Sequence, residues 1–291
     1  MEVSHPTFRQ DYIQTNGIRL HTILAGPEEG QPVVLLHGFP EFWRGWIRQL
    51  PALAEAGYRL IVPDQRGYNL SDKPKGVKSY RAGTLVDDIT GLMDALGYER
   101  AHLVGHDWGG IVAWMLAARH PERLRSLSIL NAPHPAAMFK HLTRDAGQVR
   151  RSWYALMFQL PWLPEAGLRA RNWRGAVRAL RGSGRVHTFT TEDIAAYREA
   201  WSQAGAITAM LNWYRAAFWY PGRMITASAR VTVPTLVLWG MKDAALAPRL
   251  AESSMDYCDH GRLEFFPSAT HWLQHEQAEA VNSRLLEFFS S

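Results

Sequence analysis

The sequence has little of what several protein classes require, and cysteine is the clearest case. One cysteine, Cys258, occurs in 291 residues, which excludes an internal disulfide and every metal site built from several cysteines. No run reaches the roughly 18 apolar residues of a membrane-spanning helix, and residues 1–12 are too polar for a signal peptide. These absences predict a protein that has no membrane span and resides in the cytoplasm.

Excess charge of either sign is also small. Lysine and arginine together number 32, and aspartate and glutamate 27, giving a formal net charge of +5. An excess of this size often serves solubility alone, so we expect no nucleic-acid partner. The hydrophobic content of 47%, by contrast, is enough to build a large buried core.

What the chain does contain is an alternation of apolar runs and helical patterns. Asn16-Gly17 separates two extended runs and predicts a hairpin at the start of the fold. Continuous apolar runs, typical of strands buried on both faces, follow at residues 33–36, 58–62, 101–104, 124–130 and 234–239, and the pattern continues with a further strand at residues 262–266. Helical patterns lie between or after them, at residues 85–96, 111–119 and 277–289. This order predicts an α/β fold with a mostly parallel central sheet flanked by helices.

The alternation fails between residues 133 and 229. This stretch has aromatic clusters, frequent arginine and mainly helical periodicity, and strand-like runs resume only after it. We interpret it as an inserted helical cap. The remaining segments, residues 1–132 and 230–291, then form one α/β core.

A row of arginines marks this predicted cap. Arg171, Arg174, Arg178, Arg181 and Arg185 recur at helical spacing. The simplest interpretation is a solvated helix face. An anionic partner or a membrane surface is the alternative, although nearby glycines would fray the end of the row.

A glycine-rich turn, Gly105 to Gly109, joins a predicted strand to a predicted helix. Small residues two places on either side of Asp107 are typical of a nucleophile elbow, and the helix amino terminus favours an anion there. Because Asp107 is a carboxylate where serine is usual, we expect it to displace at a saturated carbon and form an alkyl ester that water then hydrolyses. The alternative is an aspartate that only caps the helix, since such turns are common in parallel sheets.

Chain order supplies partners for this nucleophile. Asp243 directly follows a buried strand, and His271 lies in the loop before the closing helix, which matches the order nucleophile, acid, histidine. We expect His271 to deprotonate the hydrolytic water and Asp243 to orient the imidazole. The alternative is that both are ordinary loop residues. The backbone amides of Phe39 and Trp108 are the expected oxyanion hole.

Other polar residues near these motifs have simpler interpretations. His37 is expected to pack and hydrogen-bond, and Asp64 and Arg66 to brace the loop after the fourth strand. His106 would shape the turn or pack beneath it. Asn131 ends a strand where some related enzymes keep their acid, and an amide cannot take that role.

Together the motifs resemble the α/β-hydrolase superfamily and, within it, the epoxide hydrolases. The matching segments are HGFP, DQRGY, GHDWGG, WGMKD and THW, which span nearly the whole chain. Within the predicted cap, SWYALMFQLP and LNWYR are similar to the segments that carry the family's paired epoxide-binding tyrosines, which implies this role for Tyr154 and Tyr214. Phenols suit it, because ring opening releases an alkoxide that must be hydrogen-bonded or protonated.

The resemblance implies an enzyme that converts a small apolar epoxide and water into a vicinal diol, with Phe39 and Trp108 contacting the substrate and with no cofactor or metal. A haloalkane dehalogenase is the main alternative, because it shares the Asp nucleophile, the following tryptophan and the histidine but binds a leaving halide. The HGFP loop and both tyrosine segments favour the epoxide. A non-catalytic homologue that only binds a ligand is a further alternative, although every catalytic position is filled.

Overall fold

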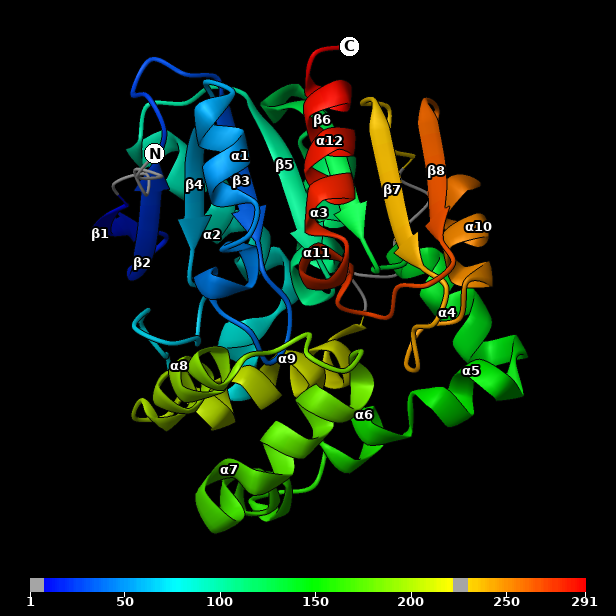
Figure 1. Ribbon diagram of the computed structural model, residues 1–291. Helices are drawn as coiled ribbons and strands as arrows, with labels where there is room; N and C mark the ends of the chain where they lie inside the picture. Colours follow the sequence, from blue (N-terminus) through cyan, green and yellow to red (C-terminus); the bar gives the residue numbers. More distant parts are fainter. Residues whose placement is uncertain (1–7, 222–229) are drawn as a thin grey trace.

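A computed structural model describes residues 8–221 and 230–291 of the chain. Its centre is an eight-stranded sheet in the order β1-β2-β4-β3-β5-β6-β7-β8 (Figure 1). The predicted hairpin is confirmed: β1 (Arg9–Thr15) and β2 (Ile18–Ala25) pair antiparallel around Asn16-Gly17. β2 also runs antiparallel to β4, whereas the strands from β3 to β8 are mutually parallel. The prediction of a mostly parallel sheet is therefore confirmed.

The six parallel strands coincide with the strands predicted from the sequence. They are β3 (Pro32–Leu36), β4 (Arg59–Pro63), β5 (Ala101–His106), β6 (Leu124–Leu130), β7 (Thr235–Gly240) and β8 (Gly261–Phe266). Every residue of β3, β5 and β7 is buried, because helices cover both faces of the sheet.

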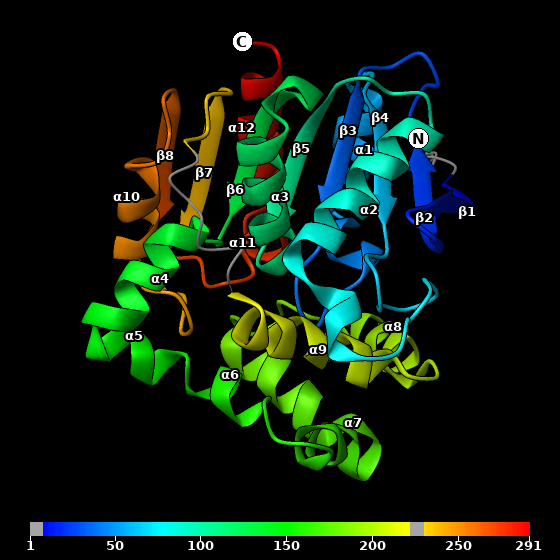
Figure 2. The ribbon, with the colours of Figure 1, turned by 180° about the vertical axis from the view of Figure 1, so that it is seen from behind.

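Helices form a layer on each face of the sheet. α1 (Leu50–Glu55) and α12 (Ala278–Phe289) cover the face seen in Figure 1, and α2 (Ala82–Ala95) and α3 (Trp108–Arg119) cover the face seen in Figure 2. Each layer buries its own apolar cluster against the strands. Shorter elements of this part are η1 (Trp43–Trp46), η2 (Val77–Tyr80), η3 (Pro121–Arg123), α10 (Arg249–Met255) and α11 (Leu273–Glu276).

Between β6 and β7 the described residues form six helices, and we refer to them as the inserted helices. They are α4 (Pro135–Arg144), α5 (Ala146–Arg151), α6 (Trp153–Met157), α7 (Leu163–Ser183), α8 (Thr191–Ser202) and α9 (Ala206–Trp219). In both views α6 to α9 lie beyond the carboxyl ends of the parallel strands. The predicted end of the cap, residue 229, lies outside the described residues, and the division into core and cap stays a prediction. Residues 1–7 of the polar amino-terminal segment lie outside them too.

The prediction that the five arginines of the row share one helix face is wrong in one respect. The backbone leaves helical geometry from Ala170 to Trp173, and α7 ends before Gly184, so Arg171 lies in a break and Arg185 lies beyond the helix. The break accompanies burial of Trp173, whose indole N–H donates to Ser202 of α8 at 2.8 Å. Packing of this ring outweighs continuation of a helical pattern. All five arginines of the row are nevertheless exposed, in agreement with a solvated surface.

No helix in residues 8–221 and 230–291 is both long enough and apolar enough to cross a membrane.

Candidate active site

Asp107 occupies a strained turn between β5 and α3. Its backbone has φ 49° and ψ −121°, a conformation that a residue other than glycine adopts only when its surroundings enforce it. A Cβ atom at Gly105 would collide with the backbone of Gly109, and one at Gly109 would collide with the carbonyl group of Leu36. The expected need for small residues on both sides of Asp107 is therefore confirmed by the geometry.

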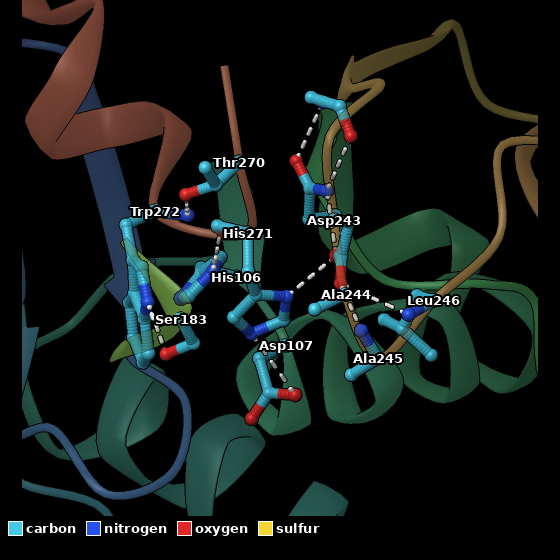
Figure 3. A network of polar contacts seen from close by, with 12 residues as sticks. His106, Asp107, Ser183, Asp243, Ala244, Ala245, Leu246, Thr270, His271 and Trp272 are labelled. Carbon is cyan, nitrogen blue, oxygen red and sulfur yellow. Dashed lines mark hydrogen bonds and ion pairs between the residues drawn. The ribbon is translucent and has the colours of Figure 1, made fainter. Parts of the chain in front are cut away.

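Two groups lie against the Asp107 carboxylate. The backbone N–H of Phe39 donates to Oδ1 at 2.8 Å, and Nε2 of His271 lies 3.6 Å from Oδ2 (Figure 3). Trp108 is the first residue of α3, where backbone N–H groups have no partner within the helix. The loop after β3 and the start of α3 thus bring the two amides of the predicted oxyanion hole to the same end of the sheet.

Asp243 holds the far side of the histidine ring. Nδ1 of His271 lies 2.7 Å from Oδ2 of Asp243 (Figure 3). The backbone amides of Ala245 and Leu246 donate to Oδ1 of Asp243 at 2.8 and 2.9 Å, and the side chain of Asn131 donates to Oδ2 at 2.8 Å. The structure therefore places Asp107, His271 and Asp243, which were predicted from their order in the chain, next to one another in a row. Asn131 supports the acid instead of replacing it.

The charges of Asp107 and Asp243 shift the protonation of His271, and the charge of His271 shifts that of Asp243. Burial alone would lower the pKa of His271, but the carboxylate of Asp243 and the hydrogen bond with Asp107 raise it well above its ordinary value. Burial alone would raise the pKa of Asp243, but the charge of His271 holds it below its ordinary value. With both carboxylates ionised, the imidazole is therefore held in its cationic form.

A buried cluster, missed in the sequence, lies beneath the turn around Glu41. The carboxylate of Glu41 accepts hydrogen bonds from the Tyr197 hydroxyl and from Nε2 of His275, both at 2.7 Å. Nδ1 of His106 lies 3.2 Å from the same carboxylate, and its Nε2 lies 2.9 Å from the backbone oxygen of His271. Burial alone would raise the pKa of Glu41, but the charge of His275 and the contact with His106 lower it. The expected place of His106 beneath the turn is confirmed.

The residues expected to brace neighbouring loops do so. Nε2 of His37 accepts the backbone N–H of Gln65 at 3.1 Å. Asp64 accepts the backbone N–H of Trp43 at 2.9 Å, and Arg66 forms a buried ion pair with Asp88 at 2.6 Å. These contacts agree with the supporting roles predicted for the three side chains. Within the described residues, no group of three or more His, Cys, Asp or Glu side chains is arranged to hold a metal ion.

A cavity of about 330 Å³ lies over Asp107, between the sheet and the inserted helices. Its lining combines apolar side chains with a few polar groups, the usual composition of a small-molecule site. Asp107, Phe39 and His271 contribute from the side of the sheet. Trp108, which we also expected to contact the substrate, is not part of the described lining; its ring packs edge-on against Tyr214 at a centroid distance of 4.9 Å.

The two predicted tyrosines meet in this cavity. Tyr154 comes from α6 and Tyr214 from α9, and their ring centroids are 6.1 Å apart. Both line the cavity together with Asp107. Burial raises the pKa of each phenol, and the negative charge of Asp107 raises it further. Both hydroxyls therefore stay protonated at neutral pH and can donate.

Arg215 links the segments that carry the two tyrosines. It follows Tyr214 in α9, is 8% exposed, and donates to the backbone oxygens of Phe158 at 2.9 Å and Leu160 at 2.8 Å, just beyond α6. It also pairs with Glu165 at 2.8 Å. No role for Arg215 is predicted from the sequence, although it lies in the segment LNWYR. A charged residue among the apolar positions of a helix was the available signal.

Comparison with known proteins agrees with the resemblance. A family model described as alpha/beta hydrolase fold matches residues 31–278. The AB hydrolase superfamily protein YfhM of Bacillus subtilis is 48% identical over 96% of this chain and 97% of its own length, and Epoxide hydrolase 2 of Caenorhabditis elegans is 36% identical over 96% and 79%. The crystal structure of a variant of an epoxide hydrolase from Bacillus megaterium has a TM-score of 0.87 at 30% identity, covering 97% of this chain and 100% of that one.

Proposed function

Because the chain belongs to the α/β-hydrolase family, and within it is similar to epoxide hydrolases over nearly its whole length, we propose that it hydrolyses epoxides to vicinal diols through a covalent ester on Asp107. One observation carries the mechanism. The nucleophile position holds a carboxylate, and this carboxylate lines one cavity together with the side chains of Tyr154 and Tyr214. The substrates are an epoxide small enough for about 330 Å³, and water.

In the first step Asp107 attacks a carbon of the epoxide ring. The amide of Phe39 holds Oδ1, so Oδ2 is the oxygen that forms the new carbon–oxygen bond. As the ring bond breaks, its electron pair stays on the departing oxygen. Tyr154 and Tyr214 donate to this oxygen and supply its proton. The products of the step are an alkyl ester of Asp107 and a tyrosinate.

In the second step water attacks the ester. Esterification removes the negative charge of Asp107, one of the groups that raise the pKa of His271. The imidazolium can then give up its proton, which the tyrosinate regains, and the neutral imidazole takes a proton from water, while Asp243 stabilises the cation that forms again. The hydroxide adds to Cγ of Asp107, and the amides of Phe39 and Trp108 stabilise the resulting oxyanion. Collapse of this intermediate breaks the ester bond, and the proton of the added hydroxyl group passes to the leaving alkoxide. This step releases the diol and restores the carboxylate of Asp107, with the imidazole again cationic.

The test follows the oxygen atom that enters Asp107. Purified protein is mixed with a small aryl epoxide in water enriched in heavy oxygen, under single-turnover conditions, and the peptide containing Asp107 is weighed. We expect diol to form and one heavy oxygen to appear in Asp107. His271→Gln is the control, because it leaves the nucleophile in place and should give an unlabelled ester.

Two results would contradict this proposal. Diol without label in Asp107 would mean that water attacks the ring directly. No diol from a panel of epoxides, together with halide release from haloalkanes, would instead identify a haloalkane dehalogenase.

We further propose that the protein acts in the cytoplasm. The single cysteine is buried, and nothing in the composition requires an oxidising compartment. Fractionation of cells that produce the untagged protein tests this, and recovery from the medium would contradict it.

A further inference from the structure

Residues 150–185, which include α6 and α7, account for the chain's net positive charge. They contain eight arginines and one acidic residue, whereas the other 255 residues contain 24 basic and 26 acidic ones. The acidic residue, Glu165, is buried in its ion pair with Arg215. All eight arginines are exposed: Arg150, Arg151, Arg169, Arg171, Arg174, Arg178, Arg181 and Arg185. This end of the molecule is therefore strongly cationic.

The same segment exposes a row of large apolar side chains. Trp153, Leu156, Met157 and Leu160 follow one another at helical spacing, with exposed fractions of 60%, 60%, 39% and 45%, and Trp162 and Leu163 continue the row at 79% and 61%. Their neighbours Tyr154 and Phe158 line the cavity, as does part of Trp153. The segment is thus apolar on both sides, and one side faces outward. We call the six exposed side chains and the eight arginines the α6–α7 face.

We propose that the α6–α7 face docks on an anionic lipid bilayer. Tryptophan and leucine side chains can enter the boundary between headgroups and acyl chains, and arginines beside them can reach the lipid phosphates. A second copy of the chain fits this face poorly, because two such faces would oppose eight arginines to eight. α6 and α7 lie at the end of the molecule beyond the strands, where a flat surface can approach them (Figures 1 and 2).

Docking in this orientation would bring the cavity to the bilayer. Arg151 and Trp153 line the cavity and are also exposed, so they mark a place where the cavity meets the surface. Apolar compounds concentrate in bilayers. Bilayer contact itself does not depend on turnover, so it can be tested apart from the proposed reaction.

The first experiment measures sedimentation of the full chain with vesicles. We expect it to bind vesicles of phosphatidylcholine mixed with phosphatidylglycerol, to bind pure phosphatidylcholine far more weakly, and to be released by salt. Absence of binding to the mixed vesicles at low salt would overturn the proposal. A dimer in sedimentation velocity that buries this face would also overturn it. So would a salt-sensitive complex with an acidic protein that outcompetes the vesicles.

Matched variants locate the contact. The double variant Leu156→Ser and Trp162→Ser should weaken vesicle binding on the order of 100-fold, because two large apolar side chains no longer become buried in the bilayer. Hydrolysis of a dissolved epoxide should be unchanged, since neither residue lines the cavity. Tyr12→Ser removes an exposed ring from β1 instead and should leave vesicle binding unchanged. Equal binding by both variants would overturn the proposal.

The charge contribution has its own pair of variants. Arg178→Gln should weaken binding to the mixed vesicles about fivefold, as one basic residue near an anionic surface contributes about 1 kcal/mol. Arg125→Gln removes the same charge from an exposed position near the amino end of β6 and should have no effect. Equal losses in the two variants would indicate a general effect of net charge and would contradict docking through α7.

Discussion

The two sides of the cavity are built differently. On the sheet side, backbone geometry places the reactive groups: Asp107 lies in a strained turn, and Asp243 accepts two backbone amides. On the side of the inserted helices, side chains place them: the short helix that carries Tyr154 is tied to α9 by Arg215. Local backbone constraints leave motifs that can be recognised in a sequence, whereas contacts between distant side chains leave almost none.

The largest expected effect comes from the sheet side. Asp107→Ala should lower diol formation by ~10⁴-fold or more and abolish the ester, because no other group can accept the alkyl carbon. His271→Gln should also stop turnover but should let one equivalent of ester form and persist. Rapid-quench kinetics with mass spectrometry distinguishes the two. An ester in Asp107→Ala, or none in His271→Gln, would contradict the assigned roles.

Removing the tyrosine hydroxyls tests the other side of the cavity. Tyr154→Phe and Tyr214→Phe should each slow ester formation on the order of 10²-fold, because one donor to the departing oxygen remains, and the double variant should lose far more. Ester hydrolysis should change little, since the phenols act at ring opening. Single-turnover rates of the two steps provide the measurement. A main effect on ester hydrolysis would mean that the tyrosines serve the water and not the ring oxygen.

Breaking the link between the tyrosine segments is expected to have a smaller effect on rate. Arg215→Met should slow ester formation ~10-fold, as the tyrosines lose their mutual placement. It should also lower the free energy of unfolding by about 3–5 kcal/mol, because Glu165 is left buried without its partner.

Two further variants separate placement from stability. Glu165→Gln added to Arg215→Met should recover stability in urea unfolding but not the rate. Arg123→Met breaks a pair with the exposed Asp94 and should cost at most about 1 kcal/mol. Recovery of both quantities in the double variant would show that Arg215 acts only through stability.

The smallest expected effect is a shift in a pH profile. Ester hydrolysis should rise with pH as His271 loses its proton, and the pKa that governs it should lie below the pKa of His271 in the free protein, where Asp107 is charged. NMR titration of the free protein and pH-dependent single turnovers supply the two values. Equal values would mean that Asp107 and His271 are not coupled.

The sign of the matching stability effect follows from the same shift. Because the pKa of His271 is raised on folding, its contribution is fully present below the unfolded pKa, and it is lost as the pH rises through the folded one. Asp107→Asn should reduce this contribution. Urea unfolding on both sides of that range measures it.

Much of the fold could be predicted because local patterns and global structure agree. Asn16-Gly17 suits only a tight turn, and runs such as that of β5 are apolar because helices cover both faces of the sheet. The break in α7 could not be predicted in this way. It depends on Trp173 finding a pocket against α8, a contact between positions 29 residues apart.

The candidate site divides along the same line. Asp107, Asp243 and His271 follow from position in the chain, since each comes at the end of a strand or in the loop after one. Tyr154 and Tyr214 were identified by resemblance alone. The roles of Glu41 and Arg215 depend on partners remote in sequence, such as Tyr197 and Phe158, and no local pattern identifies those partners.

The buried carboxylate of Glu41 affects how the cavity can open, because it holds α8 in place. Its hydrogen bond with Tyr197 fastens α8 to the sheet, and the indole N–H of Trp201, also in α8, donates to the backbone oxygen of Pro40 at 2.6 Å. Moving α8 away would leave these buried groups without hydrogen-bond partners, at a cost of about 1–3 kcal/mol each. Moving Trp153 of α6, which is already 60% exposed, uncovers far less. We therefore expect α8 to stay in place and the cavity to open at α6, so that substrate enters and product leaves past Trp153.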